Sequence, residues 1–320
     1  MSAQSLSLRR LVLAAPRGYC AGVERAVNAV EVALDRWGPP IYVRKQIVHN
    51  RHVVRDLERR GAIFVDSEEE APVGARLVFS AHGVSPAVRE QAHARGHRTI
   101  DTTCPLVAKV HAEARHYAAK GYSIIFVGHA GHEEVEGTMG EAPDNVLLVE
   151  TVEDAERVQP TRSDRIAYLT QTTLSLDDTA AVVDVLRRRF PAIEAPPRED
   201  ICYATTNRQR AVKAMLGEID LLLVIGSANS SNSNRLVEVA RSGGVPARLI
   251  DDESEIDEAW LSGVESVGVT AGASAPESVV GRVVSWFRER GVGEIKTQDA
   301  DAETVSFRGP VELRRSSGVS

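Results

Sequence analysis

The sequence has few cysteines and no long apolar run. Its 320 residues include three cysteines, an odd number at wide spacing, which does not fit the disulfide framework of a secreted protein. No apolar run approaches the roughly 20 residues that cross a bilayer. The apolar stretch behind Arg9 and Arg10 is also shorter than a signal-peptide core of ~7–15 residues. We therefore expect a cytoplasmic protein with no membrane partner.

Two phosphate-binding motifs are missing as well. The chain contains neither a Walker sequence nor a Gly-x-Gly-x-x-Gly pattern, which argues against a nucleotide ligand. Its net charge of −7 argues against a general nucleic-acid partner. Apolar residues make up 43% and charged residues 26%, which is ordinary for a globular enzyme.

The sequence does contain one order of elements repeated three times. After each cysteine come a helical pattern, a strand that runs into a polar loop, a second strand, and a third strand that runs into another polar loop. The distance from cysteine to first loop is 29, 28 and 28 residues (49 − 20, 132 − 104 and 230 − 202). Alternating strands and helices predict parallel sheets with right-handed crossovers.

We therefore predict an α/β fold of three similar small α/β domains, with parallel sheets in a pseudo-threefold arrangement around a shared centre. The expected units are residues 21–103, 104–200 and 201–310. The N-terminal strand within residues 10–20 is expected to dock on the third unit. Val305 and Phe307 indicate a possible last strand, and residues 311–320 are expected to form a frayed tail.

The three cysteines take the same place in each repeat. Cys20, Cys104 and Cys202 each stand where a strand ends and a helix begins, the edge at which open α/β sheets bind ligands. Scattered cysteines are ordinarily unrelated buried thiols, but the repetition favours one shared iron–sulfur cluster at the centre. Three thiolates in place of the usual four would leave one iron open to a substrate. Zinc fits less well because no close-spaced cysteine pair is present.

Polar side chains suited to an anion stand on the loops that should face this centre. The candidates are His49, His82, His132, Ser230, Asn232 and Ser274. Histidine, hydroxyl and amide groups can all donate to the oxygens of an anion. An Asn-Ser-Ser-Asn-Ser-Asn run is usually a solvated turn, but its place directly behind the apolar strand at 221–225 favours a binding loop.

Glu134 is the carboxylate that the pattern singles out as an acid. It follows His132 by two residues on a strand-end loop flanked by glycines. Burial beside a bound anion would raise its pKa and make it a proton donor near neutral pH. Glu133 and Glu136 compete for this role, and a solvated acidic loop is the alternative. Thr172 could bind a substrate hydroxyl or simply cap the helix that follows.

Eight short motifs in a fixed order add a family resemblance. They are residues 17–23, 80–85, 101–105, 131–138, 170–174, 201–209, 229–236 and 270–274. The second unit, for example, carries Gly-His-Glu-Glu-Val-Glu-Gly-Thr, and the third carries Ile-Cys-Tyr-Ala-Thr-Thr-Asn-Arg-Gln. With these motifs the chain resembles the 4-hydroxy-3-methylbut-2-enyl diphosphate reductase family from residue 10 to residue 310. Two departures are Glu133, where the family often has proline, and Gly309, where it commonly has an apolar residue.

The resemblance implies a [4Fe-4S] cluster on the three cysteines, with a unique iron that binds the C4 hydroxyl of the substrate. It also implies that Glu134 donates the proton, that His132 relays protons and that Thr172 orders the hydroxyl. The implied substrate-binding residues are His49, His82, His132, Thr172, Ser230, Ser231, Asn232 and Ser274. The implied reaction is reductive dehydroxylation of an allylic diphosphate to isopentenyl and dimethylallyl diphosphate, the last step of the non-mevalonate isoprenoid pathway. Ferredoxin or flavodoxin would supply the electrons.

Three other functions compete with this one. A three-cysteine dehydratase resembling quinolinate synthase would also use an open iron, but the polar loops at His132–Glu134 and Ser230–Asn232 favour the diphosphate reductase. A non-catalytic sensor could hold a cluster or zinc in the same cage and would not need Glu134. A metal-free phosphate-binding protein would be colourless after strictly anaerobic purification.

Overall fold

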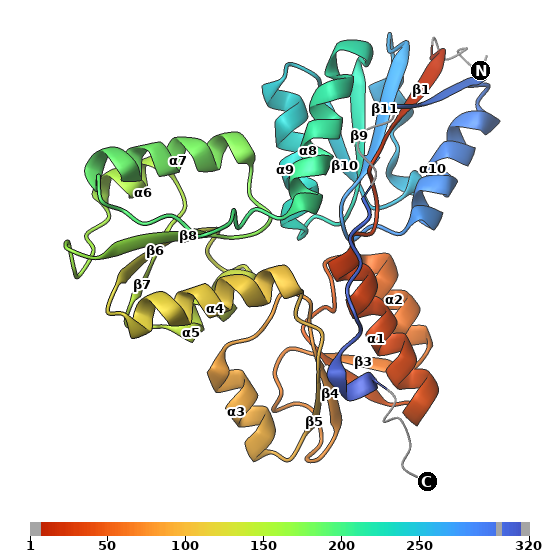
Figure 1. Cartoon of the computed structure of the whole chain (residues 1–320). Helices are drawn as coiled ribbons and strands as arrows, with labels where there is room; N and C mark the ends of the chain where they lie inside the picture. The colour runs from red at the N-terminus through yellow and green to blue at the C-terminus, as the bar shows by residue number, and fades with distance from the viewer. Residues whose placement is uncertain (1–7, 299–302, 315–320) are drawn as a thin grey trace. The chain divides into compact units, whose positions relative to one another are not determined.

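Every strand pairing in the described residues of the computed structural model, 8–298 and 303–314, is parallel. The strands form three separate sheets with helices along their faces (Figure 1). Parallel neighbours need long crossover connections, and helices provide most of them here. The predicted α/β class with three parallel sheets is confirmed. No helix in the described part of the chain is both long enough and apolar enough to span a bilayer.

Unit 1 carries a five-stranded sheet. It consists of the described residues up to Cys20, His49–Val53 and Tyr203–Val305. The sheet order is β10 (Ala247–Ile250), β9 (Leu221–Ile225), β11 (Ser266–Ala271), β1 (Arg10–Ala14) and β12 (Glu294–Gln298). Its helices are α8 (Tyr203–Met215), α9 (Ser231–Ser242) and α10 (Glu277–Glu289), with short 3-10 turns η1 (Leu216–Glu218), η2 (Glu253–Glu255) and η3 (Glu258–Leu261).

The central strands of unit 1 are buried on both faces. Leu11 of β1 packs in a core with α10, whereas its neighbour Val12 packs in a second core with α8 and α9. Leu223 and Leu222 of β9 divide between the same two cores. Strands covered on both faces need apolar residues at successive positions. This explains why they appear in the sequence as unbroken apolar runs.

Unit 2 carries two smaller sheets. It consists of Ala21–Val48, Val54–Cys202 and the described residues from Ser306 onward. One sheet has the order β3 (Ala62–Val65), β2 (Ile41–Arg44), β4 (Arg76–Phe79) and β5 (Arg98–Asp101), and the other has β7 (Val146–Val149), β6 (Ser123–Val127) and β8 (Ile166–Thr170). Its helices are α1 (Ala21–Trp37), α2 (Arg51–Arg59, which begins in unit 1), α3 (Pro86–Ala94), α4 (Pro105–Ala119), α5 (Glu133–Glu141), α6 (Val152–Arg157) and α7 (Leu176–Arg189).

One strand order recurs in all three sheets. The first strand after each cysteine (β2, β6 or β9) lies between the second (β3, β7 or β10) and the third (β4, β8 or β11). A fourth element lies beside the third strand: β5 in one sheet, β1 in another, and in the last an isolated bridge from Ala167 to Glu194. A cysteine follows each of these fourth elements. β1, the strand expected to dock on the third unit, pairs with β11. The division into three domains at residues 21–103, 104–200 and 201–310 stays a prediction.

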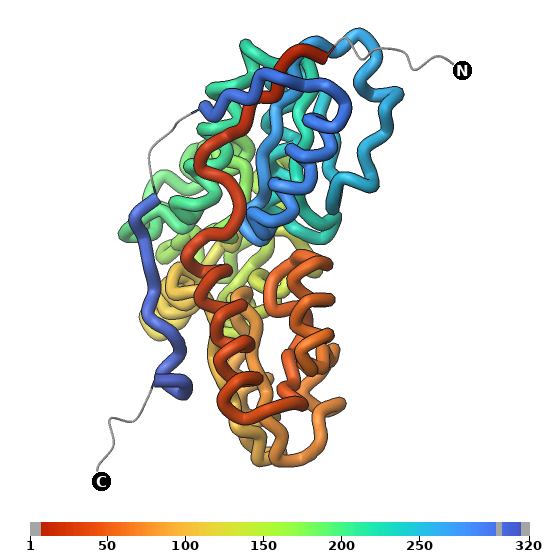
Figure 2. Tube along the Cα trace, turned by 90° about the vertical axis from the view of Figure 1, so that its right-hand side faces the viewer, coloured from red at the N-terminus to blue at the C-terminus, as the bar shows by residue number. Residues whose placement is uncertain are grey.

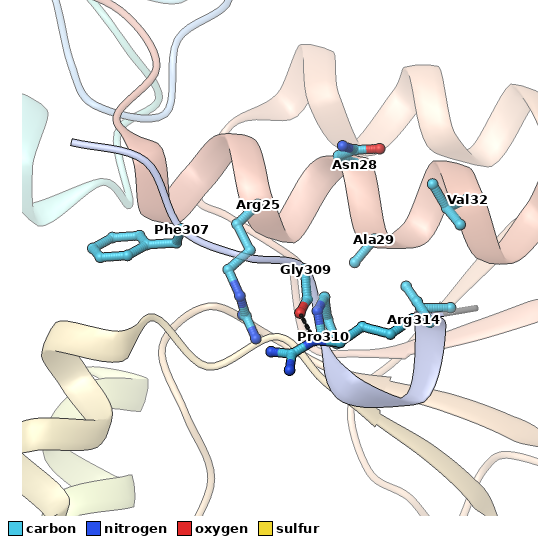
Figure 3. A pocket seen from close by; sticks show the side chains of 9 residues that line it. Arg25, Asn28, Ala29, Val32, Phe307, Gly309, Pro310 and Arg314 are labelled. Atoms are coloured by element: carbon cyan, nitrogen blue, oxygen red, sulfur yellow. Dashed lines mark hydrogen bonds between the residues drawn. The ribbon is translucent and has the colours of Figure 1, made fainter. Parts of the chain in front are cut away.

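The C-terminal segment differs from expectation. Residues 303–310 form no strand, although Val305 and Phe307 indicated one. From Ser306 the chain belongs to unit 2, where it runs beside α1 (Figure 2). Phe307, Pro310 and Leu313 line a cavity of about 180 Å³ against this helix (Figure 3). The expected frayed tail starts with a 3-10 turn, η4 (Val311–Leu313), and residues 315–320 lie outside the described residues.

Candidate active site

Each cysteine directly precedes a helix. Cys20 precedes α1, Cys104 is the N-cap of α4, and Cys202 precedes α8. All three are half-buried and none forms a disulfide. The thiolate is the form of cysteine that binds metal. The sequence predicted a strand end before each cysteine: β1 ends before Cys20 and β5 before Cys104, whereas an isolated bridge at Glu194 takes the place of a strand before Cys202.

The same hydrogen bond fixes all three cysteines. In each case the cysteine amide donates to a carbonyl on the loop that follows the third strand of a sheet. The bonds run from Cys20 to Ala273 (3.1 Å), from Cys104 to Ala81 (2.9 Å) and from Cys202 to Thr172 (3.0 Å). Each carbonyl lies on the loop behind the third strand of a parallel sheet, so each cysteine lies at the carboxyl edge of a sheet, where ligands bind in open α/β folds.

Glu134 lies buried in unit 2 and is held by Thr172. Only 2% of Glu134 is exposed. The amide of Thr172 donates to Glu134 Oε1 (2.7 Å), and its hydroxyl donates to Oε2 (3.1 Å). Burial raises the pKa of Glu134 to about 7, although both bonds from Thr172 act to lower it. Since the carbonyl of Thr172 accepts from the Cys202 amide, a proton-holding acid and a cysteine are joined through one residue.

His132 is held as a neutral ring beside this acid. It is the N-cap of α5, and its Nδ1 accepts the amide of Glu134 (3.1 Å). Burial, with a contribution from the positive charge of His82, lowers the pKa of His132 to about 3. A neutral ring that accepts at Nδ1 carries its hydrogen on Nε2, so His132 can donate from that atom. The ring of His82 lies edge-on to it, with 5.7 Å between the centroids.

The three competing glutamates are separated by their surroundings. Glu133 pairs with His82, whose Nδ1 lies 3.0 Å from Glu133 Oε2. Burial acts to raise the pKa of Glu133, but the hydrogen bond and charge of His82 outweigh it and the pKa is lowered. Glu136 is exposed. Glu134 is therefore the one among these three that is placed to hold a proton near neutral pH, whereas Glu133 is an ionised partner of a histidine.

Unit 1 gathers a second set of the predicted residues at the start of α9. Ser230 is the N-cap, and its hydroxyl oxygen accepts the amide of Ser233 (3.4 Å). Ser231 is the first helical residue, and Asn232 Oδ1 accepts the amide of Ala273 (2.8 Å). Ser230 and Asn232 are 4% and 5% exposed. The first amides of a helix together with its dipole attract anions, so this corner suits phosphate oxygens.

His49 and Ser274 adjoin this corner. The hydroxyl of Ser274 donates to the carbonyl of His49 (2.9 Å), and the amide group of Asn229 lies 3.2 Å from His49 Nδ1. Both predicted residues are buried, at 9% and 7% exposed. Gly272 lets the two loops close, because a Cβ there would lie 2.0 Å from Ser233 Oγ. Cys20 is bonded to the residue before Ser274, so it belongs to the same corner.

The predicted residues thus form two internally connected groups. The group in unit 2 contains Cys104, Cys202, His82, His132, Glu134 and Thr172. The group in unit 1 contains Cys20, His49, Ser230, Ser231, Asn232 and Ser274. Sequence reasoning missed Asn229 beside His49, and Gln171, whose buried amide accepts from His129 (3.1 Å) and donates to Thr173 (2.9 Å). Their position directly behind apolar strands was the available signal.

Comparison with known proteins agrees with this arrangement. The family model described as LytB protein matches residues 11–288, a range that contains every residue of both groups. The chain belongs to the LytB protein family. A relative of this LytB protein from Acidothermus cellulolyticus, named 4-hydroxy-3-methylbut-2-enyl diphosphate reductase, is 59% identical over 98% of this chain and 92% of its own length. A relative of the same name from Nocardia farcinica is 55% identical over 96% and 91%.

Two solved structures also resemble this LytB protein. The E-1-hydroxy-2-methyl-but-2-enyl-4-diphosphate reductase from Plasmodium falciparum superposes with a TM-score of 0.93, at 39% identity, over 96% of this chain and 97% of its own. A second structure is described as (E)-4-hydroxy-3-methyl-but-2-enyl diphosphate reductase, the terminal enzyme of the non-mevalonate pathway. It superposes with a TM-score of 0.62, at 30% identity, over 88% of this chain and 100% of its own.

Proposed function

We propose that this LytB protein is a 4-hydroxy-3-methylbut-2-enyl diphosphate reductase. A relative of this name is 59% identical over 98% of the chain. The observation in the structure that carries the proposal is Glu134, a buried acid with a pKa of about 7 that is tied through Thr172 to Cys202. A dehydroxylation needs a proton at the departing oxygen, and this residue can hold one at neutral pH.

The reaction removes the C4 hydroxyl of the substrate as water. It consumes two electrons and two protons, and it leaves isopentenyl or dimethylallyl diphosphate. Ferredoxin or flavodoxin is the proposed electron donor. This chemistry requires a redox group that takes electrons from such a donor and passes them to the substrate.

We propose that Cys20, Cys104 and Cys202 together bind one [4Fe-4S] cluster. The fit is supported by their chemistry: three half-buried thiols outside any disulfide, each at a helix N-terminus and each held by the same amide hydrogen bond. When bound, such a cluster supplies electrons and one iron that is open to a substrate oxygen. Zinc is disfavoured, because its structural sites use close-spaced cysteine pairs.

The residues of unit 2 manage the proton. Glu134 gives its proton to the departing hydroxyl, and Thr172 orients that hydroxyl with the same side chain that contacts Glu134. His132 donates a hydrogen bond from Nε2, because its Nδ1 already accepts the Glu134 amide. The imidazole of His82 stays oriented by Glu133.

The residues of unit 1 bind the diphosphate. Ser230, Ser231 and Asn232 offer hydroxyl, amide and main-chain donors at the start of α9. His49 and Ser274 add two more side chains, and His82 and His132 complete the proposed set.

The test is anaerobic purification followed by counting of iron and sulfide, EPR spectroscopy and turnover. We expect brown protein with about four irons per chain, the number in a cubane cluster. Dithionite-reduced protein should convert the allylic diphosphate and leave the substrates of quinolinate synthase unchanged. Colourless, iron-free protein with full activity would contradict the proposal, and a stable cluster without turnover would favour the sensor.

A further inference from the structure

Each helix that follows a cysteine carries a basic side chain near its start. These residues are Arg25, Lys109 and Arg208, which follow their cysteines by five, five and six residues (25 − 20, 109 − 104 and 208 − 202). Each of them donates hydrogen bonds to main-chain carbonyls that lie one to four residues before a different cysteine. The proposed chemistry makes no use of these three side chains, so their common pattern calls for another explanation.

Arg25 of α1 holds the backbone before Cys104. Its guanidinium donates to the carbonyls of Asp101 (3.3 Å) and Thr103 (3.2 Å). Its Nε donates to the carbonyl of Arg308 (2.9 Å), which ties the C-terminal segment to the same point. Figure 3 shows the side chain reaching from α1 past this segment.

Lys109 of α4 holds the backbone before Cys202. Its ammonium donates to the carbonyls of Arg198 (2.6 Å) and Glu199 (3.2 Å) and to Asp200 Oδ1 (2.7 Å). The Asp200 side chain is fully buried, and its other oxygen accepts the amide of Thr170 (2.9 Å). The loop before Cys202 is therefore fixed both to α4 and to the end of β8.

Arg208 of α8 holds the backbone before Cys20. Its side chain is completely buried, and Nη2 donates to the carbonyls of Gly18 (2.7 Å) and Tyr19 (3.4 Å). Nη1 pairs with Glu303 Oε1 (2.9 Å), which balances the buried charge. A buried guanidinium with its donors directed at two successive carbonyls leaves this loop little freedom to move.

We propose that Arg25, Lys109 and Arg208 are positioning residues that set the three cysteine loops for cluster binding. The contacts follow a cyclic order along the chain. The helix after Cys20 anchors the loop of Cys104, the helix after Cys104 anchors that of Cys202, and the helix after Cys202 anchors that of Cys20. A cluster with three protein ligands depends on each of them, so a loop that moves weakens the whole site. This inference rests on the proposed cluster ligands.

The test compares Lys109→Met with two matched variants. Lys109→Arg keeps donors for the loop carbonyls, and Lys120→Met removes an exposed lysine at the other end of α4. The double variant Lys109→Met/Asp200→Asn removes the charge left on Asp200, which separates loss of the loop anchor from the cost of an unpaired buried carboxylate. Arg25→Met, with exposed Arg36→Met as its control, repeats the test on a second loop.

The measurements are iron and sulfide content, the EPR spectrum, the rate of iron release to a chelator, and the Tm of the iron-free protein. We expect iron release to accelerate about tenfold or more in Lys109→Met, in the double variant and in Arg25→Met, as is typical when groups that orient metal ligands are lost. Lys109→Arg should restore slow release, and both controls should match wild type. The Tm of the iron-free protein should change little.

Two results would overturn this inference. One is wild-type release and an unchanged EPR spectrum in Arg25→Met and in both Lys109→Met proteins. The other is a fall in the Tm of the iron-free variants large enough to explain all of their iron loss by general unfolding. In that case the three side chains would have only a general structural role. Cys104→Ser separates this inference from the proposed cluster ligands. If Cys104→Ser binds as much iron as wild type, the cluster assignment fails. If Cys104→Ser is iron-free while the Arg25 and Lys109 variants release iron at the wild-type rate, only the positioning roles are refuted.

Discussion

Replacing Glu134 by glutamine tests the proposed acid most directly. The substitution keeps the shape of the side chain, and the new amide oxygen can still accept the amide of Thr172. The Thr172 hydroxyl can turn to accept from the new NH₂ group. The fold and the substrate site should therefore survive, while the proton donor is lost. Because a positioned general acid contributes about 10²–10⁴-fold, we expect turnover to fall at least 100-fold.

The same substitution should make the protein more stable at alkaline pH. Burial raises the pKa of Glu134 from its ordinary 4.5 to about 7, which at about 1.4 kcal/mol per pH unit corresponds to about 3 kcal/mol. The folded protein binds more protons than the unfolded chain between these two values, so the free energy of unfolding of wild type falls as the pH rises through this window. Glutamine carries no such proton. The difference in the free energy of unfolding between the variant and wild type should therefore shift by about 3 kcal/mol in favour of the variant as the pH rises from about 4 to about 8.

Two assays check the two halves of this prediction. Turnover of the cluster-containing enzyme is measured as a function of pH. The wild-type rate should fall above about pH 7, where Glu134 loses its proton, and the rate of Glu134→Gln should show no such fall. Urea unfolding of the iron-free proteins at several pH values gives the stability difference. Glu136→Gln, at an exposed position of the same helix, is the control and should match wild type in both assays. A Glu134→Gln enzyme that turns over at the wild-type rate, or stability curves that stay parallel, would refute the reasoning.

Three further substitutions test the remaining roles. His132→Asn keeps an oxygen that can accept the Glu134 amide, so the free energy of unfolding should change by about 1 kcal/mol or less. It loses the Nε2 donor, so kcat in a steady-state assay should fall at least tenfold. Ser274→Ala removes a buried hydroxyl, which should cost about 1 kcal/mol in urea unfolding and raise KM for the diphosphate more than it lowers kcat. Cys202→Ser should lose most of its iron yet keep the far-UV circular dichroism of iron-free wild type, because its main-chain bond to Thr172 remains; full iron content in this variant would contradict its role as a ligand.

Burial explains which elements the sequence revealed and which it concealed. The run at 221–225 identified β9 because that strand is covered on both faces. The helix after Cys202 gave a weaker pattern because α8 turns Arg208 and Gln209 inward, where apolar residues would make the period visible. β12 has no apolar pattern, since it lies at the edge of its sheet with most of its side chains exposed. Phe307 suggested a strand, but it lines a cavity against α1, which local sequence does not indicate.

The choice among the three neighbouring glutamates shows where spacing stops being informative. Glu133, Glu134 and Glu136 all belong to the first turn of α5, so any of them could have faced the substrate. Residues far away in sequence decide their chemistry. Glu133 is paired with His82 and Glu134 is bonded to Thr172, whereas Glu136 is exposed. A buried acid keeps its proton only if nearby positive charge is small or already paired. Here the nearest imidazole is kept neutral by burial and the other is paired with a carboxylate, which allows a proton donor and a row of histidines to occupy the same site.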